Sequence, residues 1–178
     1  MQESILETPR LRLSELQRTD APFLMELLNE PAFLQNIGDK QVRSIEDAYR
    51  YLQEGPWASY AAHGFGLWRV DLLTDGTPIG ICGLLKRPFL LHADLGYAVL
   101  QRFWSRGYAL EAAQATLDYA RTRFQLRTLF AMTALENPAS IRVLEKLGFR
   151  FDRIENFPGY ATASRVFRWE GSDEVIKS

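Results

Sequence analysis

The stretch from Gln101 to Ala112 carries residue types that could bind an anion. It joins a predicted strand to the start of a predicted helix, and it contains Arg106 and Gly107. Unpaired backbone N–H groups at a helix start, together with the helix dipole, attract negative charge. Gly107 would let the backbone approach a phosphate closely, because it has no side chain in the way. An ordinary turn between a strand and a helix also favours glycine, so this stretch alone leaves both interpretations open.

A second stretch, from Glu136 to Phe149, predicts a helix with clear start and stop signals. Asn137 is a typical N-cap, Pro138 fits the first helical turn, and Gly148 is a typical C-terminal stop. Asn137 could therefore be only the N-cap of this helix, with no role in binding.

The other reactive side chains argue against metal and nucleophilic chemistry. His63 and His92 lie far apart and have no Cys or carboxylate at a spacing typical of a metal site, so we expect no metal. Cys82 alternates with apolar neighbours, which favours a small buried residue over a nucleophile. The chain has no Gly-x-Ser-x-Gly motif, which argues against a serine hydrolase of the common type.

Hydrophobic periodicity and turn signals predict the elements that position these stretches. Ser44 and Asp47 form an approximate capping box for a helix that Gly55-Pro56 should end. Strands are expected over 10–13, 66–72, 78–85, 92–100, 128–134, 149–154 and 164–169, and helices after Asp20, Ser44, Gly107 and Asn137. The resulting order, β-α-α-β-β-β-α-β-α-β-β, predicts an α+β fold with a mixed sheet and helices on both sides.

Length and composition limit the class of protein. The 178 residues argue for one domain, and 47% hydrophobic with 24% charged residues excludes a disordered chain or a coiled coil. No stretch approaches the roughly 18 apolar residues of a membrane span. Glu3 and Glu7 lie where a signal peptide would be basic, and the single cysteine cannot form an internal disulfide. These features predict a cytoplasmic globular protein.

The charge is unevenly distributed along the chain. Residues 1–100 hold 9 Lys and Arg against 13 Asp and Glu, a net charge of −4, whereas residues 101–155 hold 9 against 6, a net charge of +3. A nucleic-acid-binding domain would show a larger basic surplus. A small polyanionic ligand bound by the 101–155 segment fits this asymmetry better.

Together the two stretches resemble the GNAT superfamily of acetyl-CoA-dependent N-acetyltransferases, especially the branch of ribosomal-protein N-terminal (alanine/serine) acetyltransferases. That branch shows Trp-Gly-x-Gly-x-Ala-x-Glu-Ala, then Asn-x-x-Ser and Leu-Gly-Phe. The matching residues here are Trp104-Ser105-Arg106-Gly107-Tyr108-Ala109-Leu110-Glu111-Ala112, Asn137-Pro138-Ala139-Ser140 and Leu147-Gly148-Phe149, with Thr8-Pro9-Arg10-Leu11-Arg12-Leu13 and Leu95-Gly96-Tyr97 as further matches. The resemblance covers residues 7–170 as one domain and leaves 171–178 as a C-terminal tail.

The resemblance implies a GNAT fold with six or seven strands and about four helices. In that fold the strands at 92–100 and 128–134 are parallel but splay apart, which admits the pantetheine arm of acetyl-CoA. Backbone groups of Val99 and Leu100 should stay free to bind this arm, and Arg142 should approach the adenosine end. The implied cofactor-binding residues are Val99, Leu100, Gln101, Arg102, Trp104, Ser105, Arg106, Gly107, Tyr108, Ala109, Asn137, Ser140 and Arg142.

Two residues depart from the family pattern. Ser105 replaces a common Gly, which is tolerable if its φ is negative. Leu144 occupies the position where many GNAT enzymes have a Tyr that protonates the departing thiol, and Ser140 is the usual substitute within this branch. Asp94 lies where the family often has an acid that acts on the amine through water, although a solvated strand carboxylate is the alternative. The implied catalytic residues are thus Ser140 and Asp94.

The implied activity is transfer of acetyl from acetyl-CoA to a primary amine, by direct attack and without an acetyl-enzyme. A protein N-terminal α-amine is the favoured acceptor. A small-molecule amine, such as a polyamine or a drug-like compound, stays open. So does a non-catalytic acyl-CoA-binding sensor, because Leu144 cannot act as an acid. We expect a monomer or a homodimer, with neither nucleic acid nor membrane as a partner.

Overall fold

A computed structural model describes residues 3–171 of the chain, in which eight strands form one mixed sheet in the order β1-β2-β3-β4-β5-β6-β8-β7. The strands are β1 (Ser4–Glu7), β2 (Leu11–Glu15), β3 (Leu67–Leu72), β4 (Pro78–Leu85), β5 (Asp94–Val99), β6 (Thr128–Ala134), β7 (Arg150–Glu155) and β8 (Ser164–Glu170). The α-helices are α1 (Ala21–Leu28), α2 (Pro31–Asn36), α3 (Ile45–Leu52), α4 (Ala58–His63), α5 (Tyr108–Arg123) and α6 (Pro138–Lys146). Of the expected tail 171–178, residues 172–178 lie outside the described part.

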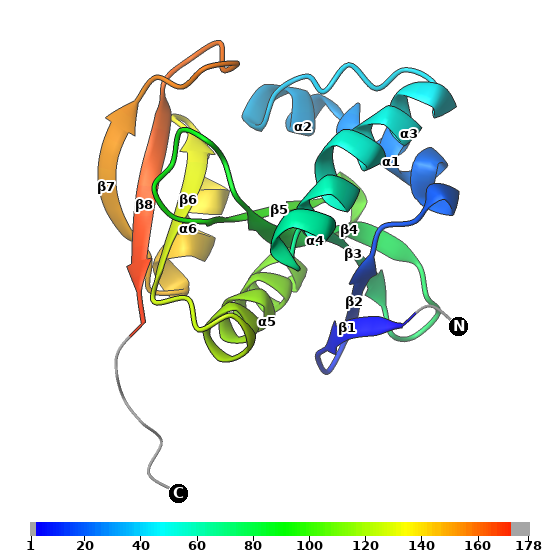
Figure 1. The fold of residues 1–178 in the computed structure, drawn as a ribbon, viewed down its shortest axis with the longest axis horizontal. Coiled ribbons are helices and arrows are strands. Elements are labelled where there is room, and N and C mark those ends of the chain that lie inside the picture. Colours follow the sequence, from blue (N-terminus) through cyan, green and yellow to red (C-terminus); the bar gives the residue numbers. More distant parts are fainter. Residues whose placement is uncertain (1–2, 172–178) are drawn as a thin grey trace, which may run out of the picture.

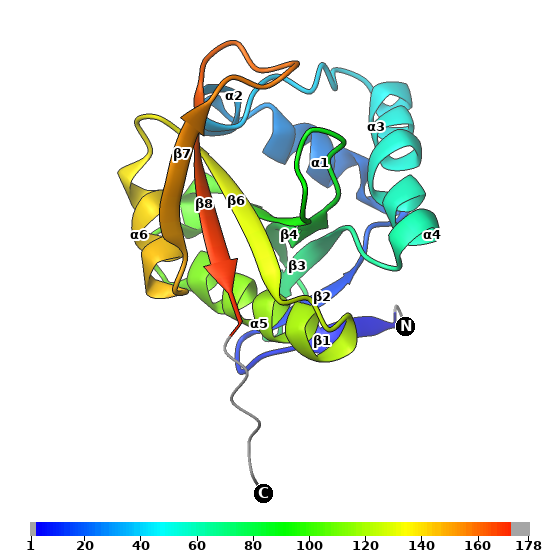
Figure 2. The same ribbon diagram turned by 60° about the vertical axis from the view of Figure 1, so that its left-hand side comes forward.

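Helices cover both faces of the sheet, as the element order predicts (Figures 1 and 2). Helices α1 and α3 pack with Ile81 and Leu100 in one buried cluster, whereas α5 and α6 pack with the other face in a second cluster. No helix within residues 3–171 is long and apolar enough to cross a membrane.

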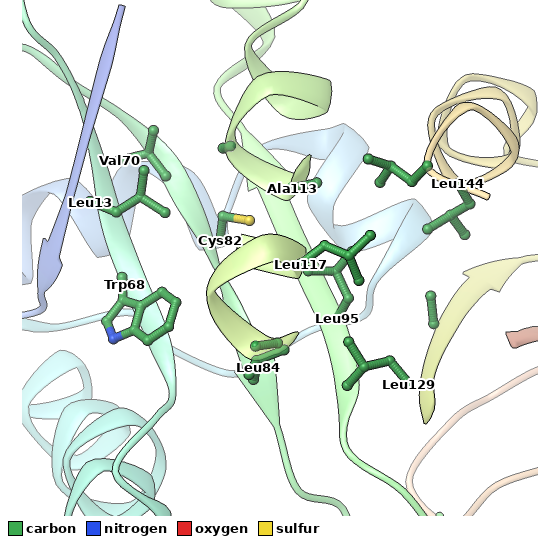
Figure 3. Packing of buried hydrophobic residues seen from close by; sticks show 14 of the residues in the cluster. Leu13, Trp68, Val70, Cys82, Leu84, Leu95, Ala113, Leu117, Leu129 and Leu144 are labelled. Atoms are coloured by element: carbon green, nitrogen blue, oxygen red, sulfur yellow. The ribbon is translucent and has the colours of Figure 1, made fainter. Parts of the chain in front are cut away.

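The larger cluster lies between α5 and the central strands. Helix α5 buries Ala112, Ala113, Thr116, Leu117 and Ala120, a spacing that puts small side chains along one stripe facing the sheet. Figure 3 shows Leu117 beside Leu95 of β5. The small residues let the helix axis approach the sheet, so the start of α5 is fixed relative to the end of β5.

Strands β5 and β6 form the single parallel pair of this sheet, and they separate after two residues. Asp94 pairs with Phe130 and Leu95 with Ala131, and no register continues beyond them. Strand β5 stays paired with β4 as far as Val99, while β6 pairs with β8 over its full length. Strand β5 thus stays with β4 and β6 stays with β8. The expected splay of β5 and β6 is confirmed (Figure 1).

The number of elements differs from the prediction of six or seven strands and about four helices. The four-residue edge strand β1 was missed, and so was α2, which begins at Pro31. Gly55-Pro56 does not end the helix after Ser44. A wider π-helical turn over Gln53–Trp57 accommodates the proline, and the chain continues into α4, which ends at Gly64 with φ +75°. The capping box of Ser44 and Asp47 is confirmed, since each side chain accepts from the other's backbone N–H.

Candidate active site

A cavity of about 1000 Å³ runs through the gap between β5 and β6. Its wall is built by α2, the loop between β4 and β5, β5, the start of α5, β6 and α6. Nine of the predicted cofactor-binding residues line it: Val99, Trp104, Ser105, Gly107, Tyr108, Ala109, Asn137, Ser140 and Arg142. Leu100, Gln101, Arg102 and Arg106 lie outside its lining. The two motifs that the sequence separates by some thirty residues therefore meet on one cavity.

The start of α5 has the features of an anion site. Gly107 is its N-cap with φ +79°, in the left-handed region that favours glycine, and no side chain caps the helix. In the first backbone hydrogen bond of α5, the Glu111 N–H donates to the Gly107 carbonyl. The N–H groups of Tyr108, Ala109 and Leu110 therefore have no intrahelical acceptor, and they can bind phosphate oxygens.

An ion pair with the N-terminal strand region fixes this helix start. The Glu111 carboxylate accepts from Thr8 Oγ1 at 2.6 Å, from Arg10 N at 3.0 Å and from Arg10 Nε at 2.6 Å. Arg10 Nη1 donates to the Arg106 carbonyl at 2.9 Å. These bonds lower the pKa of Glu111 despite partial burial, which raises it. The Thr-Pro-Arg match in the sequence is thus a support of the loop that leads into α5.

The backbone at the end of β5 is less free than expected. The Val99 carbonyl accepts from the indole Nε1 of Trp104 at 2.7 Å, and the Leu100 N–H donates to the Ile79 carbonyl at 2.8 Å. Backbone groups of alternate residues point to opposite sides of a strand. Because Leu100 points to β4, the Val99 N–H faces the gap toward β6. Of the backbone N–H groups of Val99 and Leu100, only that of Val99 is therefore available to a ligand in the gap.

Acidic residues of the α1–α2 region hold part of the loop. The Glu30 carboxylate accepts from the Gln101 N–H at 3.0 Å, and Glu26 forms an ion pair with Arg102. Gln101 and Arg102 could therefore bind the cofactor as predicted only if they gave up these contacts with Glu30 and Glu26.

Ser105 has φ +59°, so the condition under which a serine replaces the common glycine without strain is not met. A non-glycine residue in the left-handed region costs roughly 1–2 kcal/mol. The neighbouring Gly107 is left-handed as well, so the loop makes two unusual turns within three residues before α5 begins.

Helix α6 brings Asn137 and Ser140 to the cavity. Asn137 Oδ1 accepts from the Ser140 N–H at 3.3 Å, so Asn137 is the cap that its sequence pattern predicts. Ser140 Oγ lies 2.7 Å from the hydroxyl of Tyr97 on β5. Leu144, one turn later, is buried with 1% exposure. Arg142 is exposed on the cavity wall and has no ion pair within residues 3–171.

Asp94 is not the solvated carboxylate that one reading of the sequence allows. It is 1% exposed, and its two oxygens lie 3.1 and 3.0 Å from Nε of Arg87. Arg87 Nη1 also donates to the Tyr160 hydroxyl at 2.5 Å. Burial raises the pKa of Asp94, against the opposing effect of Arg87. The carboxyl lines the cavity, held by a cation from the preceding loop.

Asp94 and Ser140 approach the gap from opposite faces of the sheet. Successive β5 side chains alternate between the two faces. Tyr97 packs against the α5–α6 cluster, and Ala98 packs against the α1–α3 cluster. Asp94 shares the face of Ala98, whereas Ser140 contacts Tyr97.

The α1–α4 end of the cavity, around Asp94, holds a cation that has no partner among residues 3–171. We call it the acceptor end, defined by Lys40, Glu54, Lys86, Arg87 and Asp94. Lys40 forms no hydrogen bond or ion pair with residues 3–171, and desolvation together with the charge of Arg87 lowers the pKa of its ammonium group. Lys86 Nζ donates to two backbone carbonyls, and Arg87 pairs with Asp94. A further carboxylate of this wall, Glu30, accepts from the Gln101 N–H, so Lys40 is the cation that can attract a negatively charged group here.

Aromatic residues lie both in the core and at the cavity. Trp68 is 1% exposed and packs in the core against Tyr119, whereas Phe33 lines the cavity. Among residues 3–171 no group of three His, Cys, Asp or Glu side chains could hold a metal ion. Cys82 is buried, lies 3.3 Å from Thr116 Oγ1, and burial raises its pKa to about 12.

Replacing Cys82 with alanine is expected to leave the turnover number within a few-fold of wild type. A thiol with a pKa near 12 is almost fully protonated at neutral pH and is a poor nucleophile. The measurement is acetyl transfer by the folded variant, checked by its melting temperature. Complete loss of activity in a folded Cys82→Ala protein would point to an acetyl-enzyme instead.

Three functional contacts could not be assigned from the sequence. Glu111 and Tyr97 lie inside the motifs that carry the resemblance, but the motifs do not show their partners. Arg87 follows Lys86 in a loop without a motif, and its contact with Asp94 depends on how that loop folds back. The only signal in the sequence was that Lys86 and Arg87 directly precede an apolar loop segment, residues 88–91.

A parallel strand pair that splays beside a cavity, with a helix that begins at a glycine, is the arrangement that the resemblance to the GNAT superfamily implies. Residues 10–150 match the family of the acetyltransferase (GNAT) domain. The chain belongs to this family, and it is an acetyl-transferring enzyme.

Similar proteins support the same assignment. YkkB of Bacillus subtilis (strain 168) is 31% identical over 83% of this chain and 86% of its own. An acetyltransferase from Agrobacterium tumefaciens str. C58 superposes with a TM-score of 0.79 at 26% identity, covering 93% of this chain and 94% of that one. RimL, a ribosomal L7/L12 α-N-protein acetyltransferase solved with coenzyme A, has a TM-score of 0.79 over 94% of this chain and 98% of its own. At 18% identity, RimL shows a shared fold.

Proposed function

We propose that this enzyme transfers acetyl from acetyl-CoA to the α-amine of a protein N-terminus. The observation that carries the proposal is the acceptor end of the cavity, where Lys40, without a partner among residues 3–171, lies with the ion pair of Arg87 and Asp94. The description of RimL as an α-N-protein acetyltransferase with the same fold supports this acceptor class.

The part of the cavity at the start of α5 is suited to bind the cofactor. We assign the phosphates to the N–H groups of Tyr108, Ala109 and Leu110, where the helix dipole adds to the attraction. Arg142, which forms no ion pair with the described residues 3–171, is a cation for the adenosine end, and Asn137 lines the pantetheine path. When bound, acetyl-CoA supplies the thioester whose acetyl group is transferred.

The chemistry needs one proton acceptor and two hydrogen-bond donors. An α-amine has a pKa of about 7.7–8.0, so a useful neutral fraction exists near pH 7 and modest base assistance suffices. Asp94, directly or through water, takes the proton that the amine loses. The Val99 N–H stabilises negative charge on the thioester oxygen. Ser140 donates a hydrogen bond to the departing sulfur from the other face.

The charge of the acceptor end argues against polyamines. A polyamine remains positively charged on its other amines, and Lys40 and Arg87 would repel them at short range. A peptide with an acidic side chain close to its N-terminus can place a carboxylate near the same two cations. We therefore expect the preferred peptides to be acidic.

Thiol release with a panel of acceptors tests the proposal. N-terminal peptides with Asp or Glu close to the free amine should exceed matched Lys peptides about tenfold in kcat/KM, and spermidine should be poorer still. Lys40→Ala should reduce the acidic preference, because it removes the unpaired cation. Arg50→Ala is the matched control, since Arg50 lies on α3 outside the cavity lining and pairs with Asp47.

Three outcomes are distinguishable. Fast turnover of polyamines with slow turnover of every peptide would contradict the protein acceptor and favour a small amine. Acetyl-CoA binding without thiol release over the whole panel would favour a non-catalytic sensor. Equal use of acidic and basic peptides would leave α-amine acetylation in place but remove the role of Lys40.

A further inference from the structure

A hydroxyl pair bridges β5 and α6 across the gap between β5 and β6. Tyr97 Oη lies 2.7 Å from Ser140 Oγ and 3.3 Å from the Ser140 carbonyl oxygen. Tyr97 is two residues beyond Leu95, the last β5 residue paired with β6. Both side chains line the cavity. The bridge therefore lies beside the path that the pantetheine arm takes.

The acidity of the two groups indicates which hydroxyl donates. A 2.7 Å separation is typical of a good O–H···O bond, whereas 3.3 Å to the carbonyl is beyond the usual range. A phenol is a stronger acid than an aliphatic alcohol and is thus the better donor. Tyr97 therefore donates to Ser140 Oγ, and the Ser140 hydroxyl hydrogen stays free to point into the cavity.

The hydroxyl partner of Ser140 comes from a strand, because position 144 of the helix holds a leucine. Leu144 lies four residues after Ser140 on the same face of α6 and is buried. It has no hydroxyl to orient the serine or to contact the sulfur. Tyr97 reaches the first turn of α6 from β5 instead.

We propose that Tyr97 is a positioning residue that orients and polarises the Ser140 hydroxyl toward the departing thiolate. This inference rests on the proposed acetyl transfer. Consecutive hydrogen bonds strengthen each other, so a serine that accepts from Tyr97 is a better donor to sulfur.

The proton balance of the step requires no transfer from Tyr97. The N–C bond forms as the C–S bond breaks, the amine loses one proton to Asp94 or its water, and the electron pair of the broken bond leaves on sulfur. Burial raises the pKa of Tyr97 to about 12, whereas a thiol titrates near 8.5. The proton therefore stays on Tyr97, and the thiolate departs as a hydrogen-bonded anion.

A double-mutant cycle on the turnover number tests the inference. Ser140→Ala should lower kcat about 100-fold, the low end for a positioned donor. Tyr97→Phe keeps the ring and should lower kcat about tenfold, with unchanged melting temperature and unchanged affinity for coenzyme A. In the Ser140→Ala background, Tyr97→Phe should change kcat no further, because Tyr97 acts through Ser140. Tyr119→Phe, another partly buried tyrosine of the same cluster that lies outside the cavity lining, is the matched control.

The alternatives give different results. An unchanged kcat in Tyr97→Phe, or a further tenfold loss in the Ser140→Ala background, would overturn the inference. The wild-type to Tyr97→Phe ratio of kcat should also stay constant from about pH 7 to about pH 10, because a group with a pKa near 12 does not titrate there. A ratio that collapses above about pH 9 would instead identify Tyr97 as a proton-transferring acid. Absence of wild-type thiol release with any amine would refute the proposed function itself.

Discussion

Replacing Gly107 with valine is expected to weaken acetyl-CoA binding about 100-fold. Gly107 has φ +79°, and a Cβ there would come within 3.4 Å of Arg10 Nη2. A left-handed conformation costs an ordinary residue roughly 1–2 kcal/mol, and a β-branched side chain adds to that cost. Relief of the strain moves the N–H groups at the start of α5 away from the phosphates. Each 1.4 kcal/mol lost is a tenfold loss of affinity.

Calorimetry with coenzyme A on folded protein measures this effect. Gly76→Val is the matched control, because Gly76 has φ +74° in the turn between β3 and β4, with open space around it. It should lose similar stability and keep wild-type affinity. Equal affinity of Gly107→Val and wild type would contradict the placement of the cofactor at this helix start.

Replacing Asp94 with alanine should cost about 3 kcal/mol of unfolding free energy and lower turnover at least about 100-fold. The stability loss comes from Arg87, which stays largely buried without its carboxylate partner. The turnover loss comes from removing the proton acceptor. Chemical denaturation and thiol release measure the two effects separately.

Two further variants separate structure from chemistry. Asp71→Ala breaks another buried ion pair, with Arg69 on β3 outside the cavity lining, and should lower stability without lowering kcat. Asp94→Leu with Arg87→Met should regain stability, since a buried pair can be replaced by apolar residues at little cost, but not turnover. Wild-type turnover in that double variant would show that Asp94 is not the base.

Local signals predicted the elements well where a residue acts on its own neighbours. The caps at Ser44 and Asn137 and the bounds of β4 and β6 are confirmed. Asp20 lies at the predicted start of α1, but its side chain accepts from Gln17 N and pairs with Arg69 instead of capping the helix. A cap signal in the sequence does not show that a distant cation competes for the same oxygen.

The candidate site also has one part that the sequence predicted and one part that it did not. Its cofactor half was predictable, because a helix start and its glycine are close in sequence and carry the family pattern. Its acceptor half was not, because Tyr160 meets Arg87 across 73 residues. The contact of Ser140 with Tyr97 on the opposite face, across 43 residues, was not predictable either. The φ of Ser105 was also unpredictable, since surrounding contacts impose it against the residue's own preference.

The bond between Arg10 and Glu111 has a consequence for the order of folding. The two residues are 101 positions apart, so their contact closes a loop whose chain entropy costs roughly 4 kcal/mol. Contacts of such large sequence separation slow folding, because the entropy is lost before the contact is gained. Helix α5 is local and can form early, but the hydrogen bonds of Thr8 and Arg10 to Glu111 form only when the N-terminal strands dock. We therefore expect the support of this helix start to be completed late, when segments from distant parts of the chain have met.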